Sequence, residues 1–142
     1  MAKNSSMLPH GSMTAATRIH WARVAVGGFL AEVAVFVALV PVFLLFGQRA
    51  LPYAAPVASL VMMFLFAVWV GRRIESRFVL HGVLVGIVAT LLYVALTLAQ
   101  PEPFMYLVAH GLKIVGGAAG GFVAGRRAKT ATATRVDRAG AV

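Results

Sequence analysis

The sequence predicts an all-α, multi-pass membrane protein in which residues 21–125 form a bundle of four transmembrane helices. Hydrophobic residues make up 61% of the 142 residues and charged residues only 12%, whereas a soluble domain has about 25% charged residues. A globule of this size could not bury so much apolar surface. The apolar residues also fall into four separate runs, each close to the roughly 20 residues with which a helix crosses a bilayer.

The first two helices are expected over residues 22–46 and 51–71. From Val24 to Phe46 the first run is apolar except for Glu32, and it exceeds the roughly 7–15 residues of a signal-peptide core, so a retained helix is expected in preference to a cleaved leader. Gln48 and Arg49 mark a short turn, and the second run carries no charge. Transmembrane strands would need only about 10 residues of alternating polarity, a pattern that neither run has.

The third and fourth helices are expected over residues 78–99 and 104–125. Two prolines in the segment Gln100-Pro101-Glu102-Pro103 separate them, because proline cannot continue a helix. Residues 1–20 are polar and without periodicity, and residues 126–142 are basic and rich in Thr and Ala. Both segments are therefore predicted to be disordered extensions of the bundle.

The distribution of positive charge predicts how the helices are oriented. Eleven Lys and Arg residues lie before or at the start of the first helix, between the second and the third, or after the fourth, whereas Arg49 is the single one on the other side. Such residues favour cytoplasmic loops. Both termini are therefore expected in the cytoplasm, with the helices in the plasma (inner) membrane of a bacterium. The net charge of +9 is accordingly assigned to anionic lipid and not to nucleic acid, with candidate anchors at Arg72, Arg73, Arg126 and Arg127.

Glycines predict where the helices pack. Lipid tails compete equally for apolar side chains, so helices in a membrane associate through close backbone approach and polar contacts. The third helix has Gly82 and Gly86 on one face, together with Thr90 and Tyr93. Five glycines lie within ten residues of the fourth helix: Gly116, Gly117, Gly120, Gly121 and Gly125. We expect these stripes to join the two helices as a tight antiparallel hairpin; a glycine-lined pore or substrate site is the alternative.

Polar residues are predicted to form a layer near the middle of the membrane. Counted at 1.5 Å per residue from the cytoplasmic helix ends, Glu32 lies roughly 12 Å deep and Lys113 about 18 Å deep. The other members of the layer lie at about 18 to 22 Å; they are Ser59, Thr90, Tyr93 and His110. Charges in hydrocarbon are costly and pair with one another. We therefore expect Glu32 and Lys113 to form a buried ion pair between the first and fourth helices.

Three interpretations of this layer stay open. In the first, the ion pair is a structural clasp for the bundle. In the second, Glu32, Tyr93, His110 and Lys113 form a proton or cation relay. In the third, the two charges are buried independently, with Glu32 protonated and Lys113 reaching toward the interface.

The sequence offers no support for catalysis or metal binding. Cysteine is absent, which excludes disulfides and thiolate sites. His81 lies near the cytoplasmic end of the third helix, where an interfacial residue is expected, and His110 lies nearer the other leaflet, so the two are not expected to share a metal. No Ser/His/Asp set, phosphate loop or carboxylate pair is present. We expect no enzymatic activity, no cofactor and no metal.

The chain resembles two groups of small bacterial membrane proteins. The segment Leu30-Ala31-Glu32-Val33 in a four-helix chain is similar to the small multidrug resistance transporters, in which a first-helix glutamate exchanges protons for lipophilic cations. The charge bias, Lys113 and the basic tails depart from that family. The second helix onward more closely resembles an uncharacterised family of small inner-membrane proteins, through Gly71-Arg72-Arg73, His81-Gly82-Val83-Leu84-Val85-Gly86, His110-Gly111-Leu112-Lys113 and Gly125-Arg126-Arg127. That resemblance implies a fold and a membrane but no activity.

Two functions follow from these observations. The first is a non-catalytic membrane protein that assembles with itself or with another membrane protein in a bilayer containing anionic lipid. The alternative is a small proton-coupled transporter or ion pathway through Glu32. A transporter needs Glu32 to exchange its proton near neutral pH, whereas a clasp needs the carboxylate to stay ionised.

Overall fold

The protein consists of four long helices, with no strand in residues 19–74, 76–98 and 100–139, which are the residues that the computed structural model describes. The helices are α1 (Trp21–Phe46), α2 (Leu51–Gly71), α3 (Phe78–Leu96) and α4 (Phe104–Ala139), with a short 3₁₀ turn, η2 (Gln48–Ala50), between the first two. Each of the four is long and apolar enough to cross a membrane. The predicted all-α, four-helix membrane bundle is confirmed.

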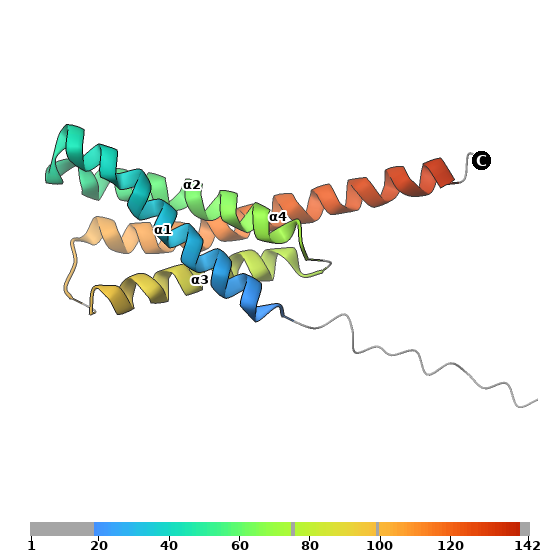
Figure 1. Cartoon of the computed structure of the whole chain (residues 1–142), viewed down its shortest axis with the longest axis horizontal. Coiled ribbons are helices and arrows are strands. Elements are labelled where there is room, and N and C mark those ends of the chain that lie inside the picture. The colour runs from blue at the N-terminus through green and yellow to red at the C-terminus, as the bar shows by residue number, and fades with distance from the viewer. Residues whose placement is uncertain (1–18, 75, 99, 140–142) are drawn as a thin grey trace, which may run out of the picture.

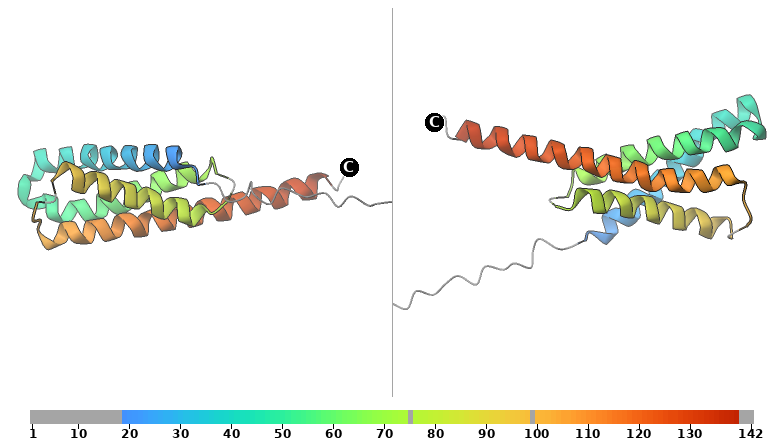
Figure 2. Two further views of the ribbon diagram at one scale, coloured as in Figure 1. Left: turned by 90° about the horizontal axis from the view of Figure 1, so that it is seen from below. Right: turned by 180° about the vertical axis from the view of Figure 1, so that it is seen from behind.

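Successive helices run antiparallel, so α1 and α3 begin and α2 ends at the same end of the bundle (Figure 1). Arg23, Arg72, Arg73 and Arg77 lie there, and we call it the basic end. Both α1 and α4 pack against α2 and α3. In contrast, no Cα atom of α1 comes within 8 Å of a Cα atom of α4 in the described part of the chain. These two helices lie on opposite sides of the bundle (Figure 2, left).

The last helix is longer than predicted and extends beyond the bundle (Figures 1 and 2). The predicted fourth helix ended at residue 125 and was followed by a disordered tail, but residues 126–139 continue the same helix. Alanine, lysine and arginine are strong helix formers, and the hydroxyls of Thr130 and Thr134 each donate a hydrogen bond to the carbonyl four residues earlier, at 3.1 Å. The disorder predicted for residues 1–18 and 140–142 lies outside the described residues.

Left-handed backbone residues mark both ends of α3. Arg77 precedes the helix with φ of 53°, and Leu98 follows it with φ of 52°. A residue in this conformation cannot continue a right-handed helix. The third helix therefore ends at Leu96, before the predicted end at residue 99.

Glycines bring α3 and α4 into backbone contact in the half of the bundle nearest the basic end. A Cβ atom at Gly82 would overlap the carbonyl oxygen of Gly117, and one at Gly117 would overlap that of Gly82. In the same way, a Cβ atom at Gly121 would overlap the carbonyl oxygen of Phe78, and one at Gly86 would lie 2.7 Å from that of Lys113. The two helices thus pack as a tight antiparallel hairpin, because only glycine permits such an approach.

The other glycines of α4 contact α2 instead. A Cβ atom at Gly116 would lie 2.5 Å from the carbonyl oxygen of Leu60, and one at Gly120 would overlap that of Phe64. The sequence prediction that both glycine stripes face the third helix is therefore wrong for these two residues. Adjacent positions on a helix point about 100° apart, so neighbouring stripes reach different partners. The fourth helix is held between α2 and α3.

The first helix is buried over only part of its length. Its buried residues are Val24, Gly27, Gly28, Ala31, Glu32 and Val35. Gly27 and Gly28 let it approach closely, since a Cβ atom there would lie 2.5 Å from the side chain of Val70 and 2.7 Å from that of Val88, respectively. None of residues 36–46 is buried. The helices are thus packed tightly near the basic end and more loosely beyond Val35.

Candidate functional site

Glu32 of α1 and Lys113 of α4 form an ion pair inside the bundle. The Nζ atom of Lys113 donates a hydrogen bond to Oε1 of Glu32 at 2.8 Å. Oε2 of Glu32 lies at the same distance from Nζ, but only Oε1 has the geometry of a hydrogen-bond acceptor toward Nζ. The two side chains are 2% and 3% exposed, respectively. The ion pair expected from the sequence is therefore present, and it joins the two helices whose backbones do not meet.

Tyr93 of α3 covers this pair from a third helix. The ammonium group of Lys113 lies 4.6 Å from the centroid of the Tyr93 ring, within the range of a cation–π interaction. The same ring stacks on Phe36 of α1, with centroids 6.1 Å apart, and lies 4.9 Å from the ring of His110. Three helices thus contribute to one cluster around the ion pair.

His110 connects this cluster to the connection that precedes α4. Its Nε2 atom lies 3.5 Å from Oε2 of Glu102. From the sequence, Glu102 was interpreted only as part of a helix breaker, so the contact with His110 was not predicted. A carboxylate just before a helix is favourable there because the helix N-terminus carries partial positive charge, and that position was the available signal.

Two buried atoms of the cluster have no hydrogen-bond partner among the described residues. They are Oε2 of Glu32 and Nδ1 of His110. A carboxylate oxygen accepts hydrogen bonds and a neutral imidazole nitrogen either donates or accepts one. Buried polar atoms in folded proteins are usually paired. Oε2 of Glu32 meets this rule through its charge, since it lies 2.8 Å from the ammonium group of Lys113, whereas Nδ1 of His110 has no partner in the described structure.

Thr90 and Ser59 are not equal members of the polar layer. The hydroxyl of Thr90 donates a hydrogen bond to the carbonyl of Gly86 in its own helix, at 3.0 Å. This local bond explains how a hydroxyl is accommodated in an apolar helix without a partner from another helix. Ser59 is buried and lies on the wall of the cavity described next.

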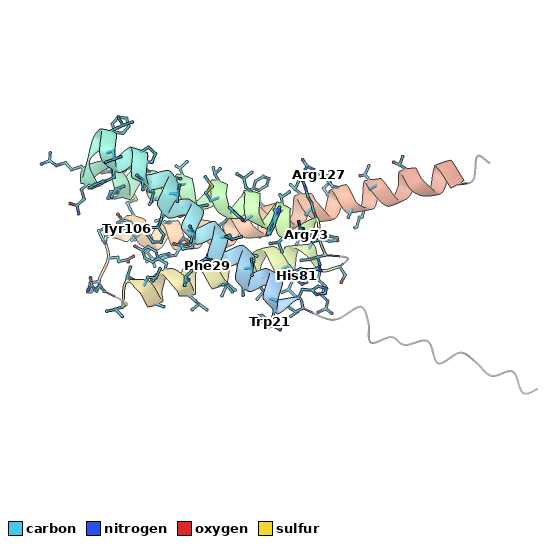
Figure 3. The ribbon with its side chains drawn as sticks, viewed as in Figure 1. Trp21, Phe29, Arg73, His81, Tyr106 and Arg127 are labelled. Carbon is cyan, nitrogen blue, oxygen red and sulfur yellow. The ribbon has the colours of Figure 1, made fainter. Side chains whose placement is uncertain are left out.

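A cavity of about 280 Å³ adjoins the cluster on the side away from the basic end. Glu32, Tyr93 and His110 are among the residues that line it. The remaining wall is almost wholly apolar and comes from α1, α2 and α4; it includes Val35, Phe36, Leu39, Val40, Phe43, Leu51, Ala55, Tyr106 and Ala109. Figure 3 shows Tyr106 at the opposite end of the bundle from Trp21 and Arg73.

His81 was predicted from the sequence to be an interfacial residue, but its side chain is buried. It is 1% exposed. The backbone N–H of His20 donates to its Nε2 at 3.4 Å, and its Nδ1 lies 3.0 Å from the carbonyl oxygen of Arg77. With the ring proton on Nδ1 both contacts are satisfied, so His81 ties the start of α1 to the start of α3 (Figure 3). These contacts indicate a structural role for His81.

The four candidate lipid anchors lie on the surface. The side chains of Arg72, Arg73, Arg126 and Arg127 are all exposed. The guanidinium of Arg73 lies 5.2 Å from the ring of Trp69, and that of Arg126 lies 5.7 Å from the ring of Phe122. Arg73 also accepts a hydrogen bond at its backbone carbonyl from the guanidinium of Arg23.

The described residues contain no group of three or more His, Asp or Glu side chains that could hold a metal ion. No protein-family model matches the chain, and no curated protein or solved structure is significantly similar to it. The geometry of the cluster and its cavity is therefore the basis on which a function can be proposed.

Proposed function

We propose that this protein is a non-catalytic, multi-pass membrane protein that acts by assembly, and that the Glu32–Lys113 pair is the clasp that closes its bundle. The observation that carries the proposal is the position of the pair, which is buried and links α1 to α4 across the bundle. In hydrocarbon, where apolar contacts discriminate little between helix and lipid, such a polar contact selects the partner helix.

The geometry favours the clasp over the other two interpretations. Independent burial would separate the charges, but they are hydrogen-bonded at 2.8 Å. A relay would need a continuous hydrogen-bonded path. Tyr93 instead contacts Lys113 through the face of its ring, and its ring is tilted by 59° against that of His110. A structural role requires only the pairing of two charges that would each be costly alone.

Substitutions of the pair by methionine test the clasp. Glu32→Met or Lys113→Met alone leaves one buried charge without its partner, which should lower the free energy of unfolding by about 3–5 kcal/mol. The double variant removes both charges, and its stability should lie much closer to that of the wild type. Unfolding by sodium dodecyl sulfate in mixed micelles measures all four proteins. A double variant no better folded than either single one would contradict the proposal.

The proposed location is the plasma membrane of a bacterium, with both termini in the cytoplasm. Eleven basic residues of the sequence support this orientation: Lys3, Arg18, Arg23, Arg72, Arg73, Arg77, Arg126, Arg127, Lys129, Arg135 and Arg138. The chain has no cysteine, so single cysteines report topology directly. In intact cells, a membrane-impermeant maleimide should label Gln48→Cys and leave Ala133→Cys unlabelled. The reverse pattern would show the opposite orientation.

Assembly beyond one chain is also part of the proposal, with a second copy or another membrane protein as the partner in a bilayer containing anionic lipid. The unburied second half of α1 and the extension of α4 supply surface for such contacts. Mass measurement of the protein in nanodiscs distinguishes a second copy of the chain from another membrane protein as the partner. A mass of a single chain, with no protein co-purified from the native membrane, would contradict assembly.

Proton-coupled transport through Glu32 is the second candidate function. It is favoured by one observation: Glu32, the acidic residue buried inside the bundle, is among the residues that line the cavity. Proton flux into proteoliposomes, compared between the wild type and Glu32→Gln, tests it. Flux that depends on Glu32 would support transport, and equal flux in the wild type and the variant would contradict it.

A further inference from the structure

We propose that a groove at the basic end, between the start of α1 and the end of α2, binds the phosphate group of an anionic phospholipid through Arg23 and Arg73. This site deepens the proposed function and rests on it, because it takes the helices to lie in a bilayer that contains anionic lipid. Two guanidinium groups would hold the phosphate, and an apolar wall beside them would hold the rest of the lipid.

The groove has a volume of about 230 Å³. Six residues from two helices line it: Ala22, Arg23 and Val26 of α1, and Trp69, Val70 and Arg73 of α2. Val70 is buried, whereas the other five are exposed. Figure 3 shows Arg73 at the same end of the bundle as Trp21. A group from outside the protein can therefore reach both arginine side chains.

Two contacts fix the arginine side chains at the groove. The guanidinium of Arg23 donates a hydrogen bond from Nη1 to the backbone carbonyl of Arg73, so it lies against the end of α2. The guanidinium of Arg73 lies 5.2 Å from the centroid of the Trp69 ring, in a cation–π contact. Each guanidinium has five N–H donors, and most of these have no acceptor among the described residues. Both groups are thus held in place with donors left for a ligand.

The charge of the groove selects an anion. The two ion pairs of the described residues include neither Arg23 nor Arg73. In the sequence, the connection between α2 and α3 has three arginines and one acidic residue, Glu75. Two cations on one groove repel each other, and an anion bound between them offsets this repulsion. Arginine binds phosphate especially well, because its fork of N–H groups matches two phosphate oxygens.

The apolar wall of the groove selects a lipid over a free phosphate ion. Val26 is 51% exposed and Trp69 is 39% exposed, so a bound lipid could cover both. Tryptophan is enriched at the level of the lipid headgroups, which places the arginines beside Trp69 at the depth of the phosphates. Val26 lies about 4.5 Å deeper than Arg23, where the glycerol and acyl chains begin.

The two arginines also discriminate between headgroups. Phosphatidylcholine carries a cation beside its phosphate, and this cation would be brought close to the two guanidinium groups. Phosphatidylglycerol has the same phosphodiester but no cation. Basic residues at a membrane surface attract such anionic lipids. Phosphatidylglycerol is therefore the probe with which we define the site.

Quenching of Trp69 fluorescence by brominated lipid tests the proposal, because Trp69 lines the groove. The chain has two tryptophans, and Trp21→Phe in the full chain leaves Trp69 as the reporter. Small fractions of phosphatidylglycerol or phosphatidylcholine, each brominated near the top of one acyl chain, are added to phosphatidylcholine vesicles that hold the protein. We expect saturable quenching, with an apparent affinity about tenfold higher for phosphatidylglycerol. Equal quenching by the two lipids would overturn the proposal.

Two variants that remove the same charge locate the lipid in the groove. Arg73→Gln should lower the preference for phosphatidylglycerol to about twofold. Arg77→Gln is the matched control, because Arg77 lies at the same end but does not line the groove, and its preference should stay near tenfold. Equal losses in both variants would show diffuse attraction and contradict a site. If Arg73→Gln does not fold, Arg73→Lys replaces it: the charge stays but the fork is lost, so the preference should fall below that of Arg77→Lys.

Two further measurements separate the lipid from a free anion and from the clasp. Millimolar inorganic phosphate should not reverse the quenching, and reversal would overturn the assignment to a lipid. The variant with both Glu32→Met and Lys113→Met should keep the preference, since Glu32 lies nine positions along α1 from Arg23. A clasp that fails in the unfolding experiment with the preference intact leaves the lipid site in place. A lost preference with a stable clasp removes the lipid site alone.

Discussion

The two halves of this bundle hold their helices together by different means. From the Glu32–Lys113 pair to the basic end, the helices touch through glycines, as at Gly82 and Gly117. Beyond the pair, side chains enclose a cavity, and the glycine that α4 has there, Gly111, is exposed and contacts no other helix. The same helix thus serves both halves. Where glycines face a neighbour the backbones meet, and where larger side chains face each other a cavity remains.

Among the changes that compare the two halves, the largest effect is expected from an added methyl group in the glycine half. Gly117→Ala would place its Cβ atom against the carbonyl oxygen of Gly82, which is backbone and cannot move aside. Overpacking of this kind costs typically about 1–3 kcal/mol, and here we expect the upper end or more. Gly111→Ala is the matched control in the other half and should be neutral or more stable by up to about 1 kcal/mol. Equal stabilities in detergent unfolding would erase the distinction between the halves.

Removing the buried histidine of the glycine half should have the next largest effect. His81→Leu leaves the N–H of His20 and the carbonyl of Arg77 without their side-chain partner. We expect a loss of about 2 kcal/mol, together with faster hydrogen exchange at the start of α1. Exchange at the far end of the same helix serves as the internal reference. Unchanged protection at residue 20 and its neighbours would show that the ring does not tie the two helices together.

Two substitutions of Tyr93, at the boundary between the halves, test whether its ring or its hydroxyl group stabilises the ion pair. Tyr93→Leu removes the cation–π contact with Lys113 and should cost about 1–2 kcal/mol. Tyr93→Phe keeps the ring and should cost less than about 0.5 kcal/mol. Thermal unfolding monitored by light scattering compares the two. If the phenylalanine variant were the weaker one, the hydroxyl and not the ring would support the pair.

The smallest effect is expected at Thr90, which the polar layer includes by depth alone. Its hydroxyl bonds within its own helix to Gly86, so Thr90→Val should change the free energy of unfolding by less than about 0.5 kcal/mol. Unfolding in mixed micelles, compared with the wild type, measures this change. A loss of stability comparable to that of Lys113→Met would show that Thr90 contributes to the cluster around the ion pair.

Much of the fold and the central ion pair could be predicted because a helix that crosses lipid needs a long run of apolar residues. Four apolar runs correspond to the four helices, and a charge inside such a run is conspicuous and needs a partner. With one acidic residue and one lysine inside the runs, the pairing of Glu32 with Lys113 had no competitor. Gly82 and Gly117 were recognisable for a related reason, since close packing in a membrane favours small residues.

Other features depend on geometry that no residue pattern encodes. The partner of Gly116 depends on how α4 is rotated about its axis, so the sequence did not distinguish α2 from α3. The burial of His81 depends on where the start of α1 lies, and the contact of Glu102 with His110 depends on a connection without regular structure. The helical continuation after Gly125 reflects local propensity that outweighed a basic composition. The cavity is space left by packing, which only the assembled helices define.

The central claim is that Glu32 and Lys113 are in direct contact within the bilayer. Solid-state NMR of the wild-type protein in lipid membranes, with ¹³C in the glutamate carboxylates and ¹⁵N in the lysine ammonium groups, measures this contact. The chain has three lysines, Lys3, Lys113 and Lys129, so two serve as internal references. We predict a strong dipolar coupling between the Glu32 carboxylate and Nζ of Lys113, matching the distance of 2.8 Å between Nζ and the carboxylate oxygens. The absence of that coupling would contradict the clasp.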